Sequence, residues 1–490
     1  MKRIGLIVIG ALLATNLIST PANAVINIGD RCSKNGMVFA KMMVCKKVKG
    51  KLVWQIAKSN DIPFAGFKDP CDPDPLTPKE FVAIQDFMYS VQHCAHPIRF
   101  VDVPLPSTKP KTKLTENLPN VEPCKLKTVT PFRTVGFSSE AWQFNGDIKL
   151  QVIPIQFSDY PTTTKPADDY KNYFHFLENM FYKISDGHTR ITFEIPDKYL
   201  EIGKPITDYE LPGTTVHGIY TWKKMDVNKY TADLFEVADK NINFSGITMA
   251  VQVVPFNTAY DYIPHSPQFR MDNIRTNEGT LKFNYIWPVP RLVDRKSTMG
   301  ADPWLHLHEF MHANGLLTDH LGDEFGTTGP NKGSGQWGHM SGMETDFLVW
   351  DKWLTKMIND SQVICADPNS TSTYWIKPME YFGEFEKMLV VPISSTKAIA
   401  IESHRVGGAN YKLPKASEGA LVYLVNSADT RHDGGINVYE PVNRTGSLGA
   451  EPFVFAHATL KLNESTLIEG YKISVVEAGA FGDVVKVEKV

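Results

Sequence analysis

The sequence lacks a strong net charge, an internal repeat and any low-complexity segment. Its 51 Lys and Arg residues nearly balance 54 Asp and Glu residues, which leaves a formal net charge of −3. Such a weak field gives no indication of a nucleic-acid or anionic-membrane partner. The hydrophobic fraction of 42% and the charged fraction of 21% are ordinary for folded proteins, and 490 residues are too many for one core. We therefore expect several globular domains.

The N-terminus has the features of a secretory signal peptide. Basic residues precede the apolar run Ile4–Ile18, and a small-residue sequence at 22–24 follows it, which predicts cleavage before Val25. An uncleaved membrane anchor is the alternative. The run is short, however, and neither a lipid-accepting cysteine at the cleavage point nor an apolar C-terminal tail accompanies it. We expect residues 1–24 to be removed and the mature protein to be secreted, without stable membrane insertion.

No CxxC pair occurs among the cysteines, which argues against a zinc site built from thiolates. An even number of cysteines in an exported chain instead favours disulfides, three in this case. Cys32 and Cys45 are the best-supported pair because they flank a short segment. Closing a loop of that size stabilises the fold by about 3 kcal/mol on the chain-entropy model. The six cysteines are Cys32, Cys45, Cys71, Cys94, Cys124 and Cys365.

Composition and periodicity divide the mature chain into four parts. Residues 25–58 predict a small β module, and the proline-rich residues 59–124 predict a linker or a pro-region. Strand and helix signals alternate over 125–365, whereas 366–490 contains short strands separated by turns. The expected fold is α+β, and its last part is expected to be an antiparallel β-sandwich. Within 125–365 the expected strands are Val152–Phe157, Ile191–Ile195, Ile247–Val254 and Phe283–Trp287, and the expected helices are Tyr170–Ile184 and Val227–Lys240.

The most informative motif is H-E-x-x-H at residues 308–312. On a helix, His308 and His312 project from one face one turn apart, so that their imidazoles can occupy two corners of a zinc tetrahedron. Glu309 then lies beside the metal and can accept a proton from a bound water molecule. A chance match is the alternative, and the helix signals around the motif argue against it.

Those helix signals lie on both sides of the motif. Asp302 suits the N-cap, Pro303 the first helical position, and Gly315 the position just after the last turn. His306 is rotated away from His308 on such a helix, so it is expected to contact neighbouring structure rather than a metal ion.

The third metal ligand is expected just after Gly315. In the pattern H-E-x-x-H-x-x-G-x-x-H the ligand falls three residues after the glycine. Thr318, a poor zinc ligand, occupies that position here. A turn one residue longer brings in Asp319, which we favour, and a turn two residues longer brings in the alternative, His320.

Further groups near the motif suit supporting roles. Met340, in a Gly- and Ser-rich turn, is similar to the methionine turn beneath the zinc site of metzincins. His339 suits a role in supporting the ligands or the transition state, with a surface position in the turn as the alternative. Asp323 and Glu324 either cap a turn, help to bind calcium or remain solvated loop residues.

With these residues the chain resembles the secreted M6-type metallopeptidases, to which the immune inhibitor A proteases belong. The resemblance covers roughly residues 125–490 and is strongest from 300 to 360. Besides the motif, it includes an opening strand at 150–159 and an S-x-G turn with the following strand at 181–195. It also includes an aromatic-rich helix at 350–353. It implies a zincin- or metzincin-like catalytic domain, a bound zinc ion and substrates that pair along an edge strand.

Two positions depart from the family pattern. Met311 stands where the family usually has a small residue, which a helix tolerates. Thr318 stands where the family places Asp, which leaves the third ligand open between Asp319 and His320.

The sequence as a whole predicts a secreted zinc-dependent endopeptidase. His308, His312 and Asp319 (or His320) are expected to hold Zn²⁺, and Glu309 is expected to be the general base. One alternative is a non-catalytic exported binding protein that retains a relic zinc site, although an intact Glu309 argues against it. Another is a zinc hydrolase that acts on a cell-wall polymer. The sequence indicates neither the cleavage preference nor the oligomeric state.

Overall fold

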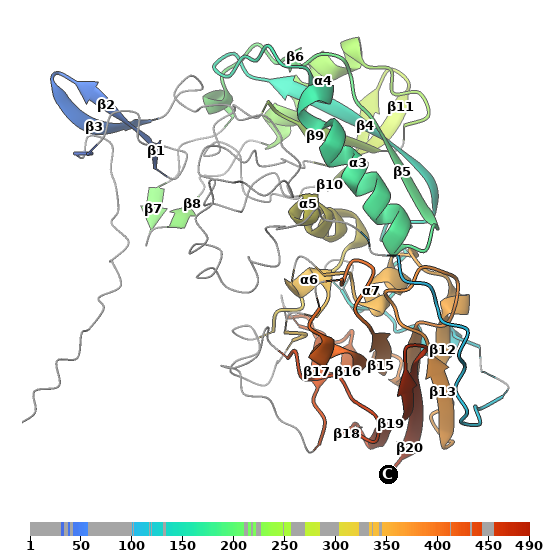
Figure 1. Ribbon diagram of the computed structural model, residues 1–490. Helices are drawn as coiled ribbons and strands as arrows, with labels where there is room; N and C mark the ends of the chain where they lie inside the picture. The colour runs from blue at the N-terminus through green and yellow to red at the C-terminus, as the bar shows by residue number, and fades with distance from the viewer. Residues whose placement is uncertain are drawn as a thin grey trace, which may run out of the picture.

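The described residues form a mixed α+β structure with many strands and few helices (Figure 1). In the computed structural model the described residues are 31–33, 38–39, 43–56, 100, 102–116, 118, 120–130, 134–209, 214–216, 219–221, 227–247, 249–255, 270–284, 303–322, 333–335, 337–342, 345–411, 413–431, 434–442 and 455–490. The expected signal peptide lies outside these residues. Within them, no helix has the length and apolar character needed to cross a membrane.

The N-terminal part contains a three-stranded antiparallel sheet in the order β1-β2-β3. A disulfide joins Cys32 to Cys45, which confirms the pair expected from sequence. The strands are β1 (Val38–Phe39), β2 (Met43–Val48) and β3 (Lys51–Ile56).

The largest sheet has the strand order β10-β11-β9-β4-β5, and the short β6 pairs with β4. Its four central pairings, β4 with β5, β6 and β9, and β9 with β11, are parallel, whereas β10 runs antiparallel to β11 at one edge. The strands are β4 (Gly146–Gln156), β5 (Thr189–Glu194), β6 (Leu200–Glu201), β9 (Met249–Val253), β10 (Arg270–Thr276) and β11 (Gly279–Asn284).

Two helices cover opposite faces of this sheet. Alternation along β4 places Leu150 and Val152 in the buried cluster that contains the apolar face of α3 (Pro166–Ile184). Ile153, one residue on, belongs to the separate cluster formed with α4 (Val227–Asn241). Strands and helices therefore alternate here as the sequence predicted. The last expected strand was wrong at its start, because β11 begins at Gly279, and residues 285–287 lie outside the described part.

The C-terminal part contains two sheets. The first has the order β12-β14-β15-β16-β17, and the second has the order β13-β20-β19-β18. Apolar side chains of both, among them Ile401 of β15 and Val485 of β20, form one buried cluster. The strands are β12 (Val363–Cys365), β13 (Ser372–Ile376), β14 (Met388–Ser394), β15 (Lys397–His404), β16 (Gly419–Asn426), β17 (Ile436–Tyr439), β18 (Ser465–Ile468), β19 (Tyr471–Gly479) and β20 (Gly482–Lys489).

The first of these sheets is buried on both faces. Along β15, Ile399 faces the second C-terminal sheet, whereas Ala400 belongs to the cluster that also contains Leu307 of the H-E-x-x-H helix. Figure 1 shows that helix, α5 (Pro303–Phe310), between the large sheet and the C-terminal sheets. Apolar side chains of this sheet and of the motif helix therefore belong to one core.

The described end of the proline-rich segment runs along the C-terminal sheets. The backbone N–H of Thr115 donates to the carbonyl of Thr373 on β13, at 2.8 Å. A second disulfide, Cys124–Cys365, closes a loop of 241 residues, which corresponds to about 5 kcal/mol on the chain-entropy model. Cys71 and Cys94 lie outside the described residues.

The remaining elements are short. They are β7 (Thr214–Val216), β8 (Ile219–Thr221), α6 (His339–Gly342), α7 (Val349–Leu354), and the 3₁₀ turns Glu122–Cys124, Ile206–Asp208, Asp360–Gln362 and Lys415–Ser417.

Candidate metal site

The H-E-x-x-H segment lies on α5 (Pro303–Phe310), which begins at Pro303 as the sequence predicted. Asp302, the expected N-cap, lies outside the described residues. The apolar face of the helix packs against the large sheet and α3, with the Phe310 ring 5.8 Å from that of Phe144 and 5.9 Å from that of Phe181. This packing fixes the rotation of the helix and so the direction in which His308 projects.

The helix then widens into a π-helical turn, Met311–Gly315. Leu316 adopts the left-handed conformation, with φ of 58°, and its N–H donates to the carbonyl of Met311. The expectation that Gly315 would follow the last helical turn was wrong, because Gly315 is the last residue of the wider turn and Leu316 takes the position after it. Gly315 is needed for space instead. A Cβ there would lie 3.0 Å from Cγ2 of Thr355 and 3.1 Å from Cε of Met311.

Three side chains converge beyond this turn. Nε2 of His308 and Nε2 of His312 lie 3.0 Å apart, and each lies 3.1 Å from Oδ1 of Asp319. Among the described residues, these three form the one group of His, Cys, Asp and Glu side chains whose ligand atoms lie close enough together to hold a metal ion. The π turn explains why Asp319, and not Thr318, lies beside the two histidines. The turn contains one extra residue, so the residue that reaches the histidines is one position later in the sequence.

The other nitrogen of each imidazole is held by a backbone carbonyl. Nδ1 of His308 lies 2.9 Å from the carbonyl of His339, and Nδ1 of His312 lies 2.8 Å from that of Leu317. A carbonyl oxygen can only accept, so each Nδ1 carries a proton, and Nε2 is the atom of each ring that can bind a cation when the ring is neutral. This arrangement is typical of histidines that bind metal ions.

The charges in the group favour an ionised carboxylate between the two rings. Burial opposes the charged form of His308, but the hydrogen bond to Asp319 and the charge of Glu309 raise the pKa of its imidazole above the ordinary value. Burial also opposes ionisation of Asp319, yet the hydrogen bonds from His308 and His312 hold the pKa of that carboxyl well below its usual range. The centre of the group is therefore suited to a cation.

His320, the alternative ligand, does not join this group. Its Nε2 lies 3.0 and 3.2 Å from the two carboxylate oxygens of Asp351 on α7, and both side chains are fully buried. Glu309 follows the first histidine directly and is half-buried. Its position next to His308 on the helix is the one that the motif predicts for a general base.

The segment that contains His339 and Met340 lies next to His308 and His320. Met340 is fully buried, and its carbonyl accepts a hydrogen bond from the backbone N–H of His320, at 3.0 Å. The surface position considered for His339 was wrong, because its side chain is buried and its Nδ1 donates to the carbonyl of Thr345, at 3.1 Å. His339 supports His308 through its backbone carbonyl.

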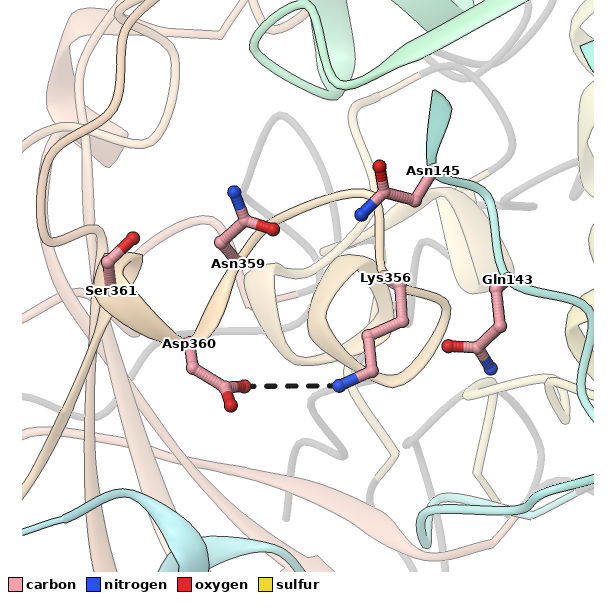
Figure 2. Close-up of a pocket in the computed structure, with 6 residues that line it drawn as sticks. All are labelled: Gln143, Asn145, Lys356, Asn359, Asp360 and Ser361. Atoms are coloured by element: carbon pink, nitrogen blue, oxygen red, sulfur yellow. Dashed lines mark ion pairs between the residues drawn. The ribbon is translucent and has the colours of Figure 1, made fainter. Parts of the chain in front are cut away.

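Two other features stand apart from this group. Asp323 and Glu324, considered for calcium, lie outside the described residues, and the side chain of His306 also lies outside them. A polar pocket of about 490 Å³ is formed elsewhere, and none of the three converging side chains lines it (Figure 2). Its lining residues are Gln143, Asn145, Lys356, Asn359, Asp360 and Ser361.

Sequence reasoning missed Asp351 and the two carbonyl acceptors. Asp351 is 31 residues from His320 and lies in an aromatic-rich helix, so no local pattern links the two residues. One feature of the sequence does reflect the π turn. The acidic residue that the family pattern places at position 318 is found at position 319.

Comparison of the sequence with protein-family models and with curated protein sequences gives no match. The resemblance to the M6-type metallopeptidases therefore rests on the residues themselves.

Proposed function

We propose that this protein is a secreted zinc-dependent endopeptidase of the M6 type. The observation that carries the proposal is the convergence of two Nε2 atoms and one carboxylate oxygen, with both Nδ1 atoms held by carbonyls. Two imidazoles and a carboxylate, with one position left for water, are a ligand set of catalytic zinc sites.

The spacing of the three atoms fits zinc after a small adjustment. Ligand atoms at two corners of a zinc tetrahedron lie about 3.3 Å apart, given zinc–ligand distances near 2.0–2.1 Å. The present separations are 3.0 and 3.1 Å. Each ligand atom thus needs to move by only a few tenths of an ångström, which rotation of the side chains can supply.

The proposed reaction is hydrolysis of a peptide bond by water. Bound zinc lowers the pKa of a coordinated water toward 7 and polarises a carbonyl group. Glu309 accepts a proton from the attacking water and then delivers it to the nitrogen of the departing amine, so that no net proton is consumed by the enzyme. His308, His312 and Asp319 would hold the ion, and the carbonyl of His339 orients the ring of His308.

The same proposal extends to the fold of the two parts of the chain. We take the large sheet with α3, α4 and α5 as a zincin-like catalytic domain and the two C-terminal sheets as a β-sandwich. The order of the sheet supports this, since β10 forms an antiparallel edge to which an extended peptide can add as a further strand.

The test is metal content together with a panel of substrates. Purified protein should contain one zinc ion per chain and should hydrolyse casein in a reaction that a chelator stops and added zinc restores. Metal-free protein without activity on casein would contradict the proposal. Zinc-dependent release of fragments from peptidoglycan, with casein left intact, would favour the cell-wall hydrolase instead.

A further inference from the structure

We propose that His320 and Asp351 are positioning residues that hold Asp319 in place for metal binding without touching the metal themselves. The inference rests on the proposed zinc site. Its starting point is that His320 directly follows Asp319 and that its side chain, fully buried, points to Asp351 rather than to the other ligands.

The backbone around Asp319 is already fixed on both sides. The carbonyl of Leu317, two residues earlier, accepts a hydrogen bond from His312. The N–H of His320 donates to Met340, and its carbonyl accepts from the N–H of Ser334 at 2.7 Å. These contacts fix the course of the chain on both sides of Asp319, and the buried side chain of His320 adds a further anchor one residue after it.

Close packing leaves the backbone just after His320 little freedom. Gly333 lies against it with a φ of 64°, and a Cβ at Gly333 would lie 2.4 Å from the carbonyl oxygen of His320. Nδ1 of His320 is buried and has no hydrogen-bond partner among the described residues, so Asp351 is the partner that orients the ring. A change in this pair should therefore reach Asp319 directly.

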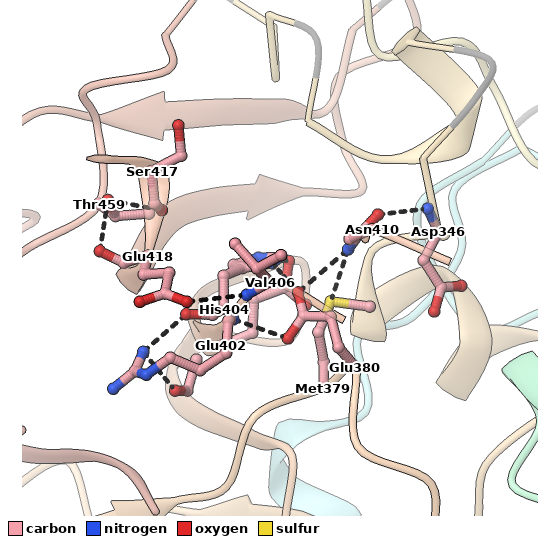
Figure 3. Close-up of polar contacts among 12 residues, drawn as sticks. Asp346, Met379, Glu380, Glu402, His404, Val406, Asn410, Ser417, Glu418 and Thr459 are labelled. Atoms are coloured by element: carbon pink, nitrogen blue, oxygen red, sulfur yellow. Dashed lines mark hydrogen bonds and ion pairs between the residues drawn. The ribbon is translucent and has the colours of Figure 1, made fainter. Parts of the chain in front are cut away.

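Asp351 is held in turn by the C-terminal sheet. It lies on α7, whose first residue, Val349, donates its N–H to Oε2 of Glu402 at 2.7 Å. Glu402 is at the end of β15, beside His404 and Glu380 in a buried charged cluster (Figure 3). The position of Asp319 thus depends on β15 through α7 and His320.

A fully buried pair of polar side chains is a poor source of stability. Desolvation offsets most of the attraction, and well-packed apolar residues often replace such a pair without loss. The pair instead fixes the orientation of the His320 ring, because both carboxylate oxygens of Asp351 contact its Nε2. Contacts of this kind around metal ligands typically change metal affinity by about 10–100-fold.

The test measures zinc affinity by chelator competition and the visible absorption of the Co²⁺-substituted protein. Asp351→Asn preserves the shape of the side chain and removes its charge, and it should weaken zinc binding by about 10-fold and alter the cobalt spectrum. The matched control is Asp483→Asn, the same change at a buried carboxylate that pairs with Arg405 in the C-terminal part. It should lower stability and leave zinc affinity unchanged. Equal losses of affinity in the two variants would overturn the proposal.

A second pair of variants separates positioning from folding. His320→Gln retains an N–H donor near the position of Nε2 and should keep zinc affinity within a few-fold of the wild type. His320→Leu removes the donor and should weaken zinc binding by about 10–100-fold. Equal affinities for these two variants would also overturn the proposal. A wild-type protein that binds no zinc would instead refute the proposed function.

Discussion

Two buried clusters in this protein are built from the same residue types and differ in what they can bind. One consists of His308, His312 and Asp319, and the other of Glu380, His404 and Glu402. In the first, backbone carbonyls accept hydrogen bonds from Nδ1 of both rings, and the two Nε2 atoms converge with a carboxylate oxygen. In the second, the imidazole lies between two carboxylates.

The second cluster already contains a cation of its own. Nδ1 of His404 lies 2.8 Å from Glu380, and Nε2 lies 3.4 Å from Glu402. The two carboxylates are on opposite edges of the ring, so their oxygens do not converge. Burial lowers the pKa of His404, but the charges of the two carboxylates raise it to about 9, so the ring is itself the cation at neutral pH. Geometry, rather than composition, therefore decides which cluster suits a metal ion.

The largest effect is expected at Glu309, which only the first cluster has beside it. Glu309→Gln should reduce hydrolysis by at least about 10²–10⁴-fold, because the water loses its base. Zinc content should remain at one ion per chain, because the three ligands are intact. Casein hydrolysis and metal analysis on the same preparation measure both. Near-normal turnover by a fully metallated variant would contradict the mechanism.

Alanine substitution of one carboxylate in each cluster should separate metal binding from stability. Asp319→Ala should weaken zinc binding by more than the roughly 100-fold expected for loss of a supporting contact, because two histidines alone hold zinc poorly. Glu380→Ala should keep zinc bound and lower the free energy of unfolding by about 3–5 kcal/mol, because it leaves His404 with only one counter-charge. Zinc titration and urea unfolding of both variants test this. Loss of zinc from the Glu380 variant alone would reverse the assignment.

The pH dependence of stability should report the second cluster. The folded-state pKa of His404, about 9, is above the ordinary value of 6.5. Its contribution is therefore complete below pH 6.5 and is lost as the pH rises toward 9, with a total of about 3 kcal/mol. Urea unfolding between pH 6 and pH 10 should show this fall in the wild type. His404→Gln should lack it, and an identical slope in the variant would argue against a protonated His404.

The smallest effect concerns the connection between the regions. Cys124–Cys365 ties the segment before the large sheet to β12 of the C-terminal part. Alkylation of the unreduced protein should label no cysteine, with Cys71 and Cys94 expected to form the third disulfide. Mass spectrometry gives the count directly. Labelling of several cysteines would contradict this expectation.

Much of the fold could be predicted because its signals are local. The helices expected at 170–184 and 227–240 match α3 and α4 to within a few residues, whereas β4 begins six residues before the expected strand. The relative positions of His308, Glu309 and His312 could also be predicted, because they depend only on the rise and twist of one helix. The Cys32–Cys45 disulfide could be predicted for the same reason, because only a short segment separates the two cysteines.

The tertiary structure decided what depends on contacts between distant segments. The sequence left the third ligand between Asp319 and His320, because a turn of either length was allowed. In the structure a π turn moves Asp319 beside the histidines, while Asp351, distant in sequence, draws His320 away. The side chain of His339 is buried and its carbonyl holds His308 because the segment around Met340 packs next to α5. Helical spacing is a property of one segment, whereas the direction of a loop side chain is set by whatever the rest of the chain brings next to it.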